Sequence, residues 1–350
     1  MNFNMDDLFG LVKTNNASDL LVTVGAPPMI RVNGKLQKTE YPILEPEDTK
    51  ELIYAIMTEE QTARLERDKE FDFSHCGADT SLRFRVNIYF QMKAIAGAFR
   101  PIASEIPSVD TLGLPTKTLT QLLKYPQGLI LVTGPTGHGK STTLASMVNL
   151  INSEQETHII TIEDPIEYVH TNKKSVIDQR ELGEDTLSFA TALKYVLRQD
   201  PDVILVGEMR DIETIAATMT AAETGHMVFA TLHTNDATQT VDRIVDVFPE
   251  AQQQQIRFQL SMSLLAVLSQ RLIPRSGDPG RIMAYEIMRN NPAVANLIRE
   301  GKTHQLYSVL ETHQRDGMVT LDACIKELYL KGLITFDDAI NNMKNPQTIM

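Results

Sequence analysis

One octapeptide constrains the fold of this chain more than any other feature. It reads Gly134-Pro135-Thr136-Gly137-His138-Gly139-Lys140-Ser141 and is followed by Thr142. This sequence matches the pattern G-x-x-x-x-G-K-[ST] in full. An apolar run at 129–132 precedes it, and a stretch with helical spacing at 141–152 follows it. The pattern therefore predicts a phosphate-binding loop (P-loop) between a buried strand and a helix.

The chemistry of this loop follows from its residue types. Glycines allow successive backbone N–H groups to curl around phosphate oxygens, and the helix N-terminus adds positive potential. Lys140 would reach the β- and γ-phosphates of a nucleotide, and the Ser141 hydroxyl would ligate Mg²⁺. A chance match in a glycine-containing turn has a probability of roughly 1% in a chain of this length. We therefore expect a nucleotide and Mg²⁺ as ligands.

Hydrolysis would also need carboxylates at the ends of neighbouring strands. Glu163 lies at the end of the run HIITIED, and Glu208 ends the run DVILVGE. The carboxyl ends of parallel strands meet at the edge of the sheet where ligands bind. One carboxylate would orient the attacking water, and another would support Mg²⁺ directly or through water. The pattern does not assign the two roles, and a solvated loop acid is the alternative for either residue.

Two histidines, His226 and His233, flank the apolar run MVFATL at 227–232. A histidine beside a strand is usually a structural hydrogen-bonding residue. His233 leaves this run toward the edge where a nucleotide would bind, so it could contact a γ-phosphate or position a loop that senses one. The spacing of the pair matches no metal-ligand motif.

The first hundred residues combine helical and strand signals. Asn33-Gly34 between apolar flanks predicts a two-residue hairpin, and Thr58 with Gln61 predicts a capping box. Residues 81–90 alternate between apolar and polar types, which predicts a half-buried strand with Arg83 and Arg85 on its other face. These arginines have two interpretations. They are either a solvated face or cations supplied to a phosphoryl group bound by a neighbouring subunit.

The second half of the chain has a different pattern. Runs that are apolar throughout alternate with helical stretches, which predicts a parallel sheet covered on both faces. From Ala251 onward the pattern predicts an almost entirely helical chain, through Gln270 and on to residues 293–300 and 320–330. The stretch 104–115 concentrates Pro, Gly, Ser and Asp, which is typical of a domain linker.

Composition narrows the class of protein. The formal net charge is −12, which weighs against a protein that coats nucleic acid. The hydrophobic fraction of 42% over 350 residues is enough for one large core or two ordinary ones. No apolar run approaches the roughly 18 residues of a membrane span, and the start is acidic where a signal peptide is basic. Two distant cysteines, Cys76 and Cys324, indicate neither a disulfide framework nor a zinc site. We expect a cytoplasmic protein.

Four motifs together resemble those of a known family. GPTGHGKSTT, ITIEDPIEY, DPDVILVGEMRD and TGHMVFATLHTNDA are similar to the Walker A, Asp box, Walker B and His box of the secretion ATPase superfamily. Within it the chain most resembles the PilT-type retraction ATPases of type IV pili. Further matching stretches lie near both ends, so the resemblance covers essentially the whole chain.

The resemblance implies an α/β fold with two domains. A PAS-like α+β domain would occupy 1–103, a linker 104–116, and a RecA-like P-loop ATPase domain 117–350, with C-terminal helices from about 280. It also implies a homohexamer with ATP and Mg²⁺ between subunits, at the cytoplasmic face of an inner-membrane pilus platform protein. A paralogous retraction ATPase is a further expected partner, and nucleic acid is not.

The resemblance also implies roles for individual residues. Glu163 is similar to the family's catalytic glutamate that activates water, and Glu208 to the Walker B glutamate near Mg²⁺. His226 and His233 match the His box. Three residues match arginines that approach the phosphates from the neighbouring subunit or clamp that interface, namely Arg83, Arg85 and Arg100.

Three positions depart from the family pattern. Lys93 replaces an arginine, His138 replaces a Ser or Thr in the P-loop, and Ala295 replaces an arginine in a motif linked to retraction. Because the P-loop position contributes mainly its backbone N–H, nucleotide binding should survive the change to His138.

Two alternatives to a retraction motor remain open within the superfamily. They are an accessory or regulatory paralogue of the motor, and a pilus extension or type II secretion ATPase. A nucleic-acid motor would need basic grooves and stacking aromatics, whereas aromatics make up only 6% of the chain.

Overall fold

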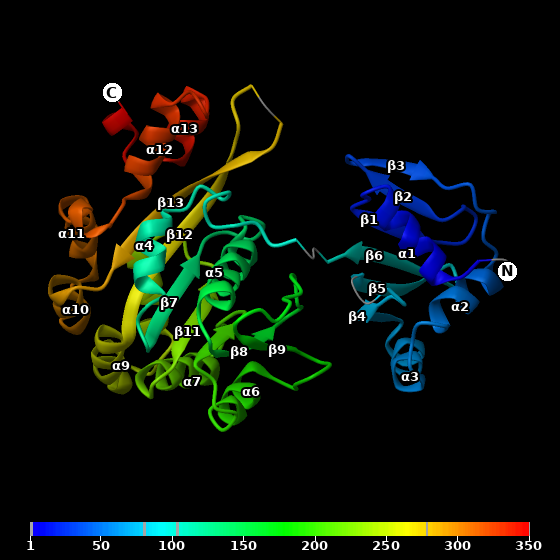
Figure 1. The fold of residues 1–350 in the computed structure, drawn as a ribbon, viewed down its shortest axis with the longest axis horizontal. Coiled ribbons are helices and arrows are strands. Elements are labelled where there is room, and N and C mark those ends of the chain that lie inside the picture. Colours follow the sequence, from blue (N-terminus) through cyan, green and yellow to red (C-terminus); the bar gives the residue numbers. More distant parts are fainter. Residues whose placement is uncertain (1–2, 80–81, 103–104, 278, 350) are drawn as a thin grey trace. The chain divides into compact units, whose positions relative to one another are not determined.

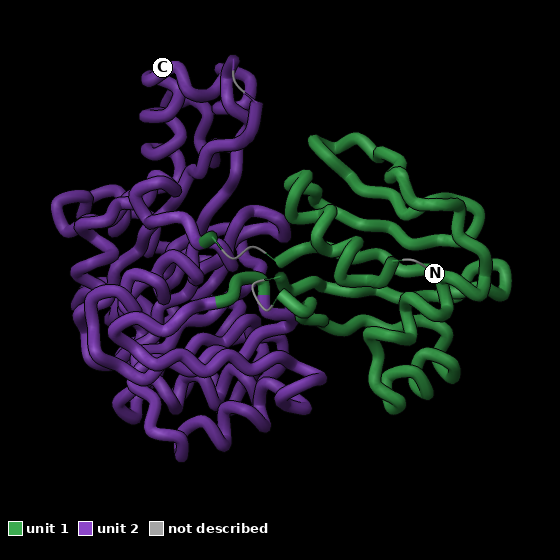
Figure 2. The backbone as a smooth tube through the Cα atoms, turned by 45° about the vertical axis from the view of Figure 1, so that its right-hand side comes forward, with its two compact units in different colours: residues 1–105, 167–169 green, residues 106–166, 170–350 purple. Residues whose placement is uncertain are grey.

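The computed structural model describes residues 3–79, 82–102, 105–277 and 279–349. The chain forms two compact units, which Figure 2 shows in different colours. Unit 1 comprises residues 1–105 and 167–169, and unit 2 comprises 106–166 and 170–350. Each unit has its own sheet and core. Ser81, at the start of the expected arginine strand, and residues 103 and 104, where the expected linker begins, lie outside the described residues.

Unit 1 is built on a six-stranded antiparallel sheet with the strand order β3-β2-β1-β6-β5-β4 (Figure 1). The strands are β1 (Asp19–Val22), β2 (Met29–Val32), β3 (Lys35–Lys38), β4 (Glu70–Cys76), β5 (Arg83–Gln91) and β6 (Ala94–Pro101). The helices of this unit are α1 (Met5–Thr14), α2 (Pro46–Tyr54) and α3 (Glu59–Asp68).

Local sequence signals set two of the boundaries in unit 1. Asn33 and Gly34 have φ values of 49° and 78°, which is the two-residue turn that joins β2 to β3. Thr58 accepts a hydrogen bond from the backbone N–H of Gln61, and the Gln61 side chain accepts one from the backbone N–H of Thr58. Both the predicted hairpin and the predicted capping box are therefore confirmed.

The predicted alternation along β5 is also confirmed. Phe84, Val86 and Ile88 are fully buried, whereas Arg85 is exposed. The ring of Phe84 stacks on that of Phe9 in α1, with 4.1 Å between the ring centroids. Because successive side chains of a strand point to opposite faces, the burial of one set places Arg85 on the other face of the sheet.

Unit 2 contains a seven-stranded sheet with the strand order β13-β12-β7-β11-β10-β8-β9 (Figure 1). Its strands are β7 (Gly128–Thr133), β8 (His158–Glu163), β9 (Val176–Glu181), β10 (Val203–Val206), β11 (Met227–Leu232), β12 (Leu264–Pro274) and β13 (Arg281–Arg289). All neighbouring strands from β12 to β9 are parallel, and β13 is antiparallel to β12. The predicted parallel sheet is confirmed.

Helices cover both faces of this sheet. Leu129 and Leu131 of β7 belong to one core cluster, and Ile130 and Val132 belong to another. The first cluster packs against α6 (Phe189–Val196), α7 (Ile212–Glu223), α8 (Ala237–Asp246) and α9 (Glu250–Ser263). The second packs against α4 (Thr116–Leu122) and α5 (Lys140–Glu154). Because both faces are buried, β7 needs apolar side chains at successive positions.

The expectation of a helix from Ala251 through Gln270 is wrong. Helix α9 ends at Ser263, and Leu264 begins β12, which pairs with β7 on one side and β13 on the other. Periodicity cannot distinguish a short apolar strand from a buried helical segment, so pairing with β7 decides the conformation here.

The expected C-terminal helices from about 280 also begin later. Residues 281–289 form β13, and the first of these helices starts at Pro292. The helices of this region are α10 (Pro292–Arg299), α11 (Leu306–Thr312), α12 (Leu321–Leu330) and α13 (Phe336–Asn342). Among the helices of the described part of the chain, none combines the length and the hydropathy that a membrane crossing requires.

Candidate functional site

The P-loop connects the carboxyl end of β7 to the first turn of α5. Gly134, Gly137 and Gly139 have φ values of 141°, 77° and 81°, a region that L-amino acids with side chains rarely adopt. A Cβ atom at Gly134 would lie 2.3 Å from the backbone oxygen of Gln270. Glycine is therefore required at 134 both for its backbone conformation and for the close approach of β12.

Lys140 lies at the start of α5 and is 9% exposed. Its Nζ atom donates hydrogen bonds to the carbonyl oxygens of Gly134 (2.8 Å) and Pro135 (3.0 Å). The same atom lies 3.3 Å from Nδ1 of His233. An ammonium group that is held against loop carbonyls is placed where phosphate oxygens would compete for it.

His233 follows β11, the strand next to β7 in the sheet. Its Nε2 atom lies 2.8 Å from a carboxylate oxygen of Glu208, and its Nδ1 atom is 3.4 Å from the hydroxyl of Thr136. Because Lys140 is a donor only, Nδ1 accepts and Nε2 carries the proton that is donated to Glu208. The imidazole thus connects the P-loop to the end of β10.

Glu208 follows β10 and forms an ion pair with Arg210 at 2.7 Å. Partial burial by itself would raise the pKa of Glu208, but the hydrogen bond and charge of Arg210 and the hydrogen bond from His233 outweigh it and lower that pKa. The group is therefore an ionised carboxylate at neutral pH. A charged oxygen beside the P-loop is a suitable ligand for Mg²⁺, as is the Ser141 hydroxyl.

Glu163 ends β8, which is separated from β7 by β11 and β10. One oxygen of its carboxylate accepts hydrogen bonds from the hydroxyl of Thr161 (2.7 Å) and the amide of Gln179 (3.1 Å). At a strand spacing of about 4.8 Å, three steps across the sheet place β8 roughly 14 Å from β7. The carboxylate is thus oriented by two donors at the same edge of the sheet as the P-loop.

His226 lies at the opposite end of β11 from His233. Its Nδ1 atom is 3.0 Å from the carbonyl oxygen of Ala221, and its own carbonyl accepts a hydrogen bond from Gly128 at the start of β7. A strand of this length spans about 20 Å. The structure therefore does not bring His226 to the P-loop of the same chain.

Strand β12 also contacts the P-loop, and the sequence pattern does not predict this contact. The Gln270 amide donates to the carbonyl oxygen of His138 at 2.7 Å. The backbone N–H of Leu272 donates to Nδ1 of His138 at 3.0 Å, and Arg281 donates to the carbonyl of Gly137 at 3.2 Å. The signal that could have revealed this hairpin is a turn-rich SGDPG segment between two apolar runs.

His138 therefore has a role beyond its backbone N–H. Burial lowers the pKa of this histidine, and the charges of Arg281, Arg271 and Lys140 lower it further. The ring is neutral at pH 7 and its Nδ1 atom accepts from β12. The side chain thus fixes the middle of the loop to the neighbouring strand.

The three predicted arginines belong to unit 1. Arg85 on β5 and Arg100 on β6 are direct cross-strand partners. Asp19 accepts two hydrogen bonds from Arg100, at 2.9 and 3.1 Å. Arg85, Arg100 and Asp19 line a hollow of about 380 Å³ on this sheet. Arg83 instead donates to the hydroxyl of Ser74 at 2.7 Å.

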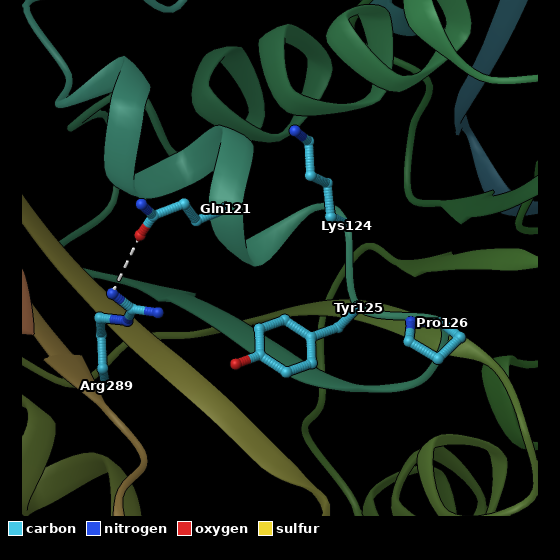
Figure 3. A pocket seen from close by; sticks show the side chains of 5 residues that line it. All are labelled: Gln121, Lys124, Tyr125, Pro126 and Arg289. Carbon is cyan, nitrogen blue, oxygen red and sulfur yellow. Dashed lines mark hydrogen bonds between the residues drawn. The ribbon is translucent and has the colours of Figure 1, made fainter.

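A separate hollow of about 360 Å³ lies next to the start of β7 (Figure 3). Arg289 donates to the side-chain oxygen of Gln121 there at 3.3 Å. The other lining residues are Lys124, Tyr125 and Pro126. The P-loop follows the other end of β7, so this hollow is not part of the candidate site.

The chain is similar in sequence to known proteins over nearly its full length. The chain is 47% identical to the type IV pilus retraction ATPase PilT of Pseudomonas aeruginosa over 344 residues, which cover 98% of this chain and 99% of that protein. It is 48% identical to a twitching motility protein of Neisseria gonorrhoeae, over 92% of this chain and 86% of that one.

A solved structure is also similar. The crystal structure of the pilus retraction motor PilT with bound ADP matches with a TM-score of 0.92 and 47% identity, over 99% of both chains. The expected fold class, a PAS-like domain followed by a RecA-like ATPase domain, is thereby confirmed. The family model for type II/IV secretion system proteins matches residues 14–340. The chain therefore belongs to the type II/IV secretion system protein family.

Proposed function

We propose that this chain is an ATP-hydrolysing motor that powers retraction of a type IV pilus and, with it, twitching motility. The observation that carries the proposal is the contact of Lys140 and Glu208 with His233 beside a complete P-loop. The names of the relatives support the pilus assignment, since one is a pilus retraction ATPase and another a twitching motility protein.

The residues present fit a magnesium nucleotide. Gly137 and Gly139 have positive φ values, and among the described residues other than its two chain neighbours no atom lies within 4 Å of a Cβ built at Gly137. Ser141 and the ionised Glu208 offer oxygen ligands of the type that Mg²⁺ prefers. Within the described ranges no three His, Cys, Asp or Glu side chains are grouped to hold a metal by themselves, so nucleotide and water oxygens would complete its shell. When bound, ATP and Mg²⁺ supply a γ-phosphoryl group open to attack by water.

The proposed mechanism assigns one task to each residue. The P-loop, residues 134–142, binds the phosphates through its N–H groups, and Lys140 neutralises their charge. Glu163 orients the attacking water and accepts its proton, with Thr161 and Gln179 holding the carboxylate in place. His233 contacts both Glu208 and the P-loop and keeps the two in fixed relative positions. No step is assigned to His226.

The proposed assembly is a homohexameric ring that acts in the cytoplasm on an inner-membrane pilus platform protein, with a paralogous retraction ATPase as a further partner. Residues 1–103 and 117–350 would be its two domains, with 104–116 as the linker. In this ring Arg83, Arg85 and Arg100 of one subunit would serve the nucleotide of its neighbour. Ala295 on α10 and Lys93 in the β5–β6 turn favour a second candidate, an accessory subunit that supports a sister motor.

The substitution Glu163→Gln tests the assignment of the base. Gln keeps an oxygen that can accept from Thr161 and Gln179 but cannot take a proton, so we expect turnover to fall by about 10²- to 10⁴-fold. Affinity for labelled ADP should remain within about twofold of the wild type, because the P-loop is untouched. Phosphate release and fluorescence anisotropy measure the two quantities. Normal turnover would exclude Glu163 as the base.

Assemblies that mix two variants test whether Arg100 acts on the neighbouring subunit. Subunits with Arg100→Ala have a complete Glu163, and subunits with Glu163→Gln have a complete Arg100. If Arg100 acts on the neighbouring site, mixing the two inactive proteins should restore part of the ATPase rate at mixed interfaces. If the mixture stays as inactive as its components, Arg100 does not act on the neighbouring site.

Deletion of the gene separates the proposed cellular roles. Loss of a retraction motor should leave cells with excess surface pili and without twitching motility. Electron microscopy counts the pili, and expansion of colonies on a surface measures motility. Cells without pili would instead identify an extension ATPase. An unchanged phenotype that becomes evident only when the sister motor is weakened would favour the accessory candidate.

A further inference from the structure

The loop that carries His233 is short and is fixed at its far end. It runs from the end of β11 to Asp236, the N-cap of α8. One carboxylate oxygen of Asp236 accepts from the backbone N–H of Gln239 at 2.8 Å. The other lies 2.9 Å from Nζ of Lys344, which is more than a hundred residues away in the sequence. Asp236 is 7% exposed, whereas the Lys344 side chain is 48% exposed, so only the carboxylate end of this ion pair is shielded from water.

Lys344 itself is held from several sides. Its backbone N–H donates to one carboxylate oxygen of Asp322 at 2.7 Å, and the N–H of Asn345 donates to the other at 2.8 Å. Its ammonium group lies 5.0 Å from the ring centroid of Tyr307. The backbone of Lys344 is therefore fixed to α12 through Asp322, while its side chain, which is 48% exposed, contacts Asp236 and Tyr307.

A buried glutamate fixes the residue that follows the loop, the first residue of α8. Glu286 of β13 is 2% exposed and accepts from the backbone N–H of Ala237 at 2.9 Å. Its second oxygen accepts from the N–H of Leu321 at 3.4 Å. Burial raises the pKa of Glu286. The first residues of α8 and α12 are thus connected through one side chain of β13.

We propose that Lys344 is a positioning residue for His233, and this inference rests on the proposed function. The ammonium of Lys344 fixes Asp236 and thereby the end of the loop. Only Thr234 and Asn235 separate Asp236 from His233, so a shift at one end reaches the imidazole. That imidazole lies between Lys140 and Glu208, and it stays there only if the loop at residues 233–236 keeps its conformation.

The variant Lys344→Met tests this role in the full-length protein. Met keeps an unbranched stem that can cover Tyr307 and removes only the charge that pairs with Asp236. We expect kcat to fall by about tenfold with KM within about twofold, since small misplacements of catalytic groups act mainly on the chemical step. Hydrogen exchange should accelerate at residues 233–240 and not in β7 or α5.

Two matched variants control the experiment. Lys344→Arg keeps the charge and should restore both kcat and exchange protection. Lys331→Met removes a lysine whose partner, Glu327, is on the same exposed face of α12, and should leave both unchanged. Because the two residues act as a pair, Asp236→Asn should not lower kcat further when it is added to Lys344→Met.

Two outcomes would contradict the proposal. Unchanged kcat and unchanged exchange in Lys344→Met would overturn it, and so would accelerated exchange throughout unit 2, which would indicate a general structural role. If the wild-type protein hydrolyses no ATP, the proposed function fails, and hydrogen exchange at 233–240 still decides whether Lys344 holds the loop.

Discussion

The site depends on where the ammonium group of Lys140 lies. Two carbonyl oxygens of the P-loop and Nδ1 of His233 converge on it as acceptors. Through His233 the same cation is linked to the carboxylate of Glu208, so one chain of polar contacts crosses the ends of β7, β11 and β10. The Lys140 ammonium can only donate hydrogen bonds, so the donor and the acceptor of each of these contacts are determined. The arrangement therefore holds a positive charge beside a loop of N–H groups, which favours a polyanion.

The rest of unit 2 keeps this arrangement rigid. Parallel strands that are buried on both faces fix the spacing between Glu163, Glu208 and His233. On the other side of β7, the β12–β13 hairpin holds the P-loop through Gln270 and through the ring of His138. The same hairpin carries Glu286, which connects α8 to α12. The P-loop is rich in glycine, and contacts from both neighbours of β7 hold it in place.

The sequence predicts those parts of the fold whose conformation is determined by residues close together in the chain. The P-loop, the half-buried strand β5 and the apolar strands of unit 2 each have a short-range pattern. Strands β12 and β13 were missed because their conformation comes from pairing with β7, and a continuous apolar run fits a helix equally well. The pairing of Lys344 with Asp236 and the contact of His138 with Leu272 join distant segments, so no spacing in the sequence indicates them. His226 and His233 share a motif, yet the length of β11 places them at opposite edges of the sheet.

The most direct test of the central claim is the affinity of Lys140→Ala for fluorescently labelled ADP, measured by anisotropy against Lys194→Ala, which removes an exposed lysine of α6. A charge-assisted hydrogen bond contributes about 1.5–3 kcal/mol, and about 1.4 kcal/mol corresponds to a factor of ten. The account predicts that Lys140→Ala weakens binding by at least about tenfold, while Lys194→Ala binds as the wild type does. Equal affinity in all three proteins would show that the nucleotide does not bind at this loop and would contradict the account.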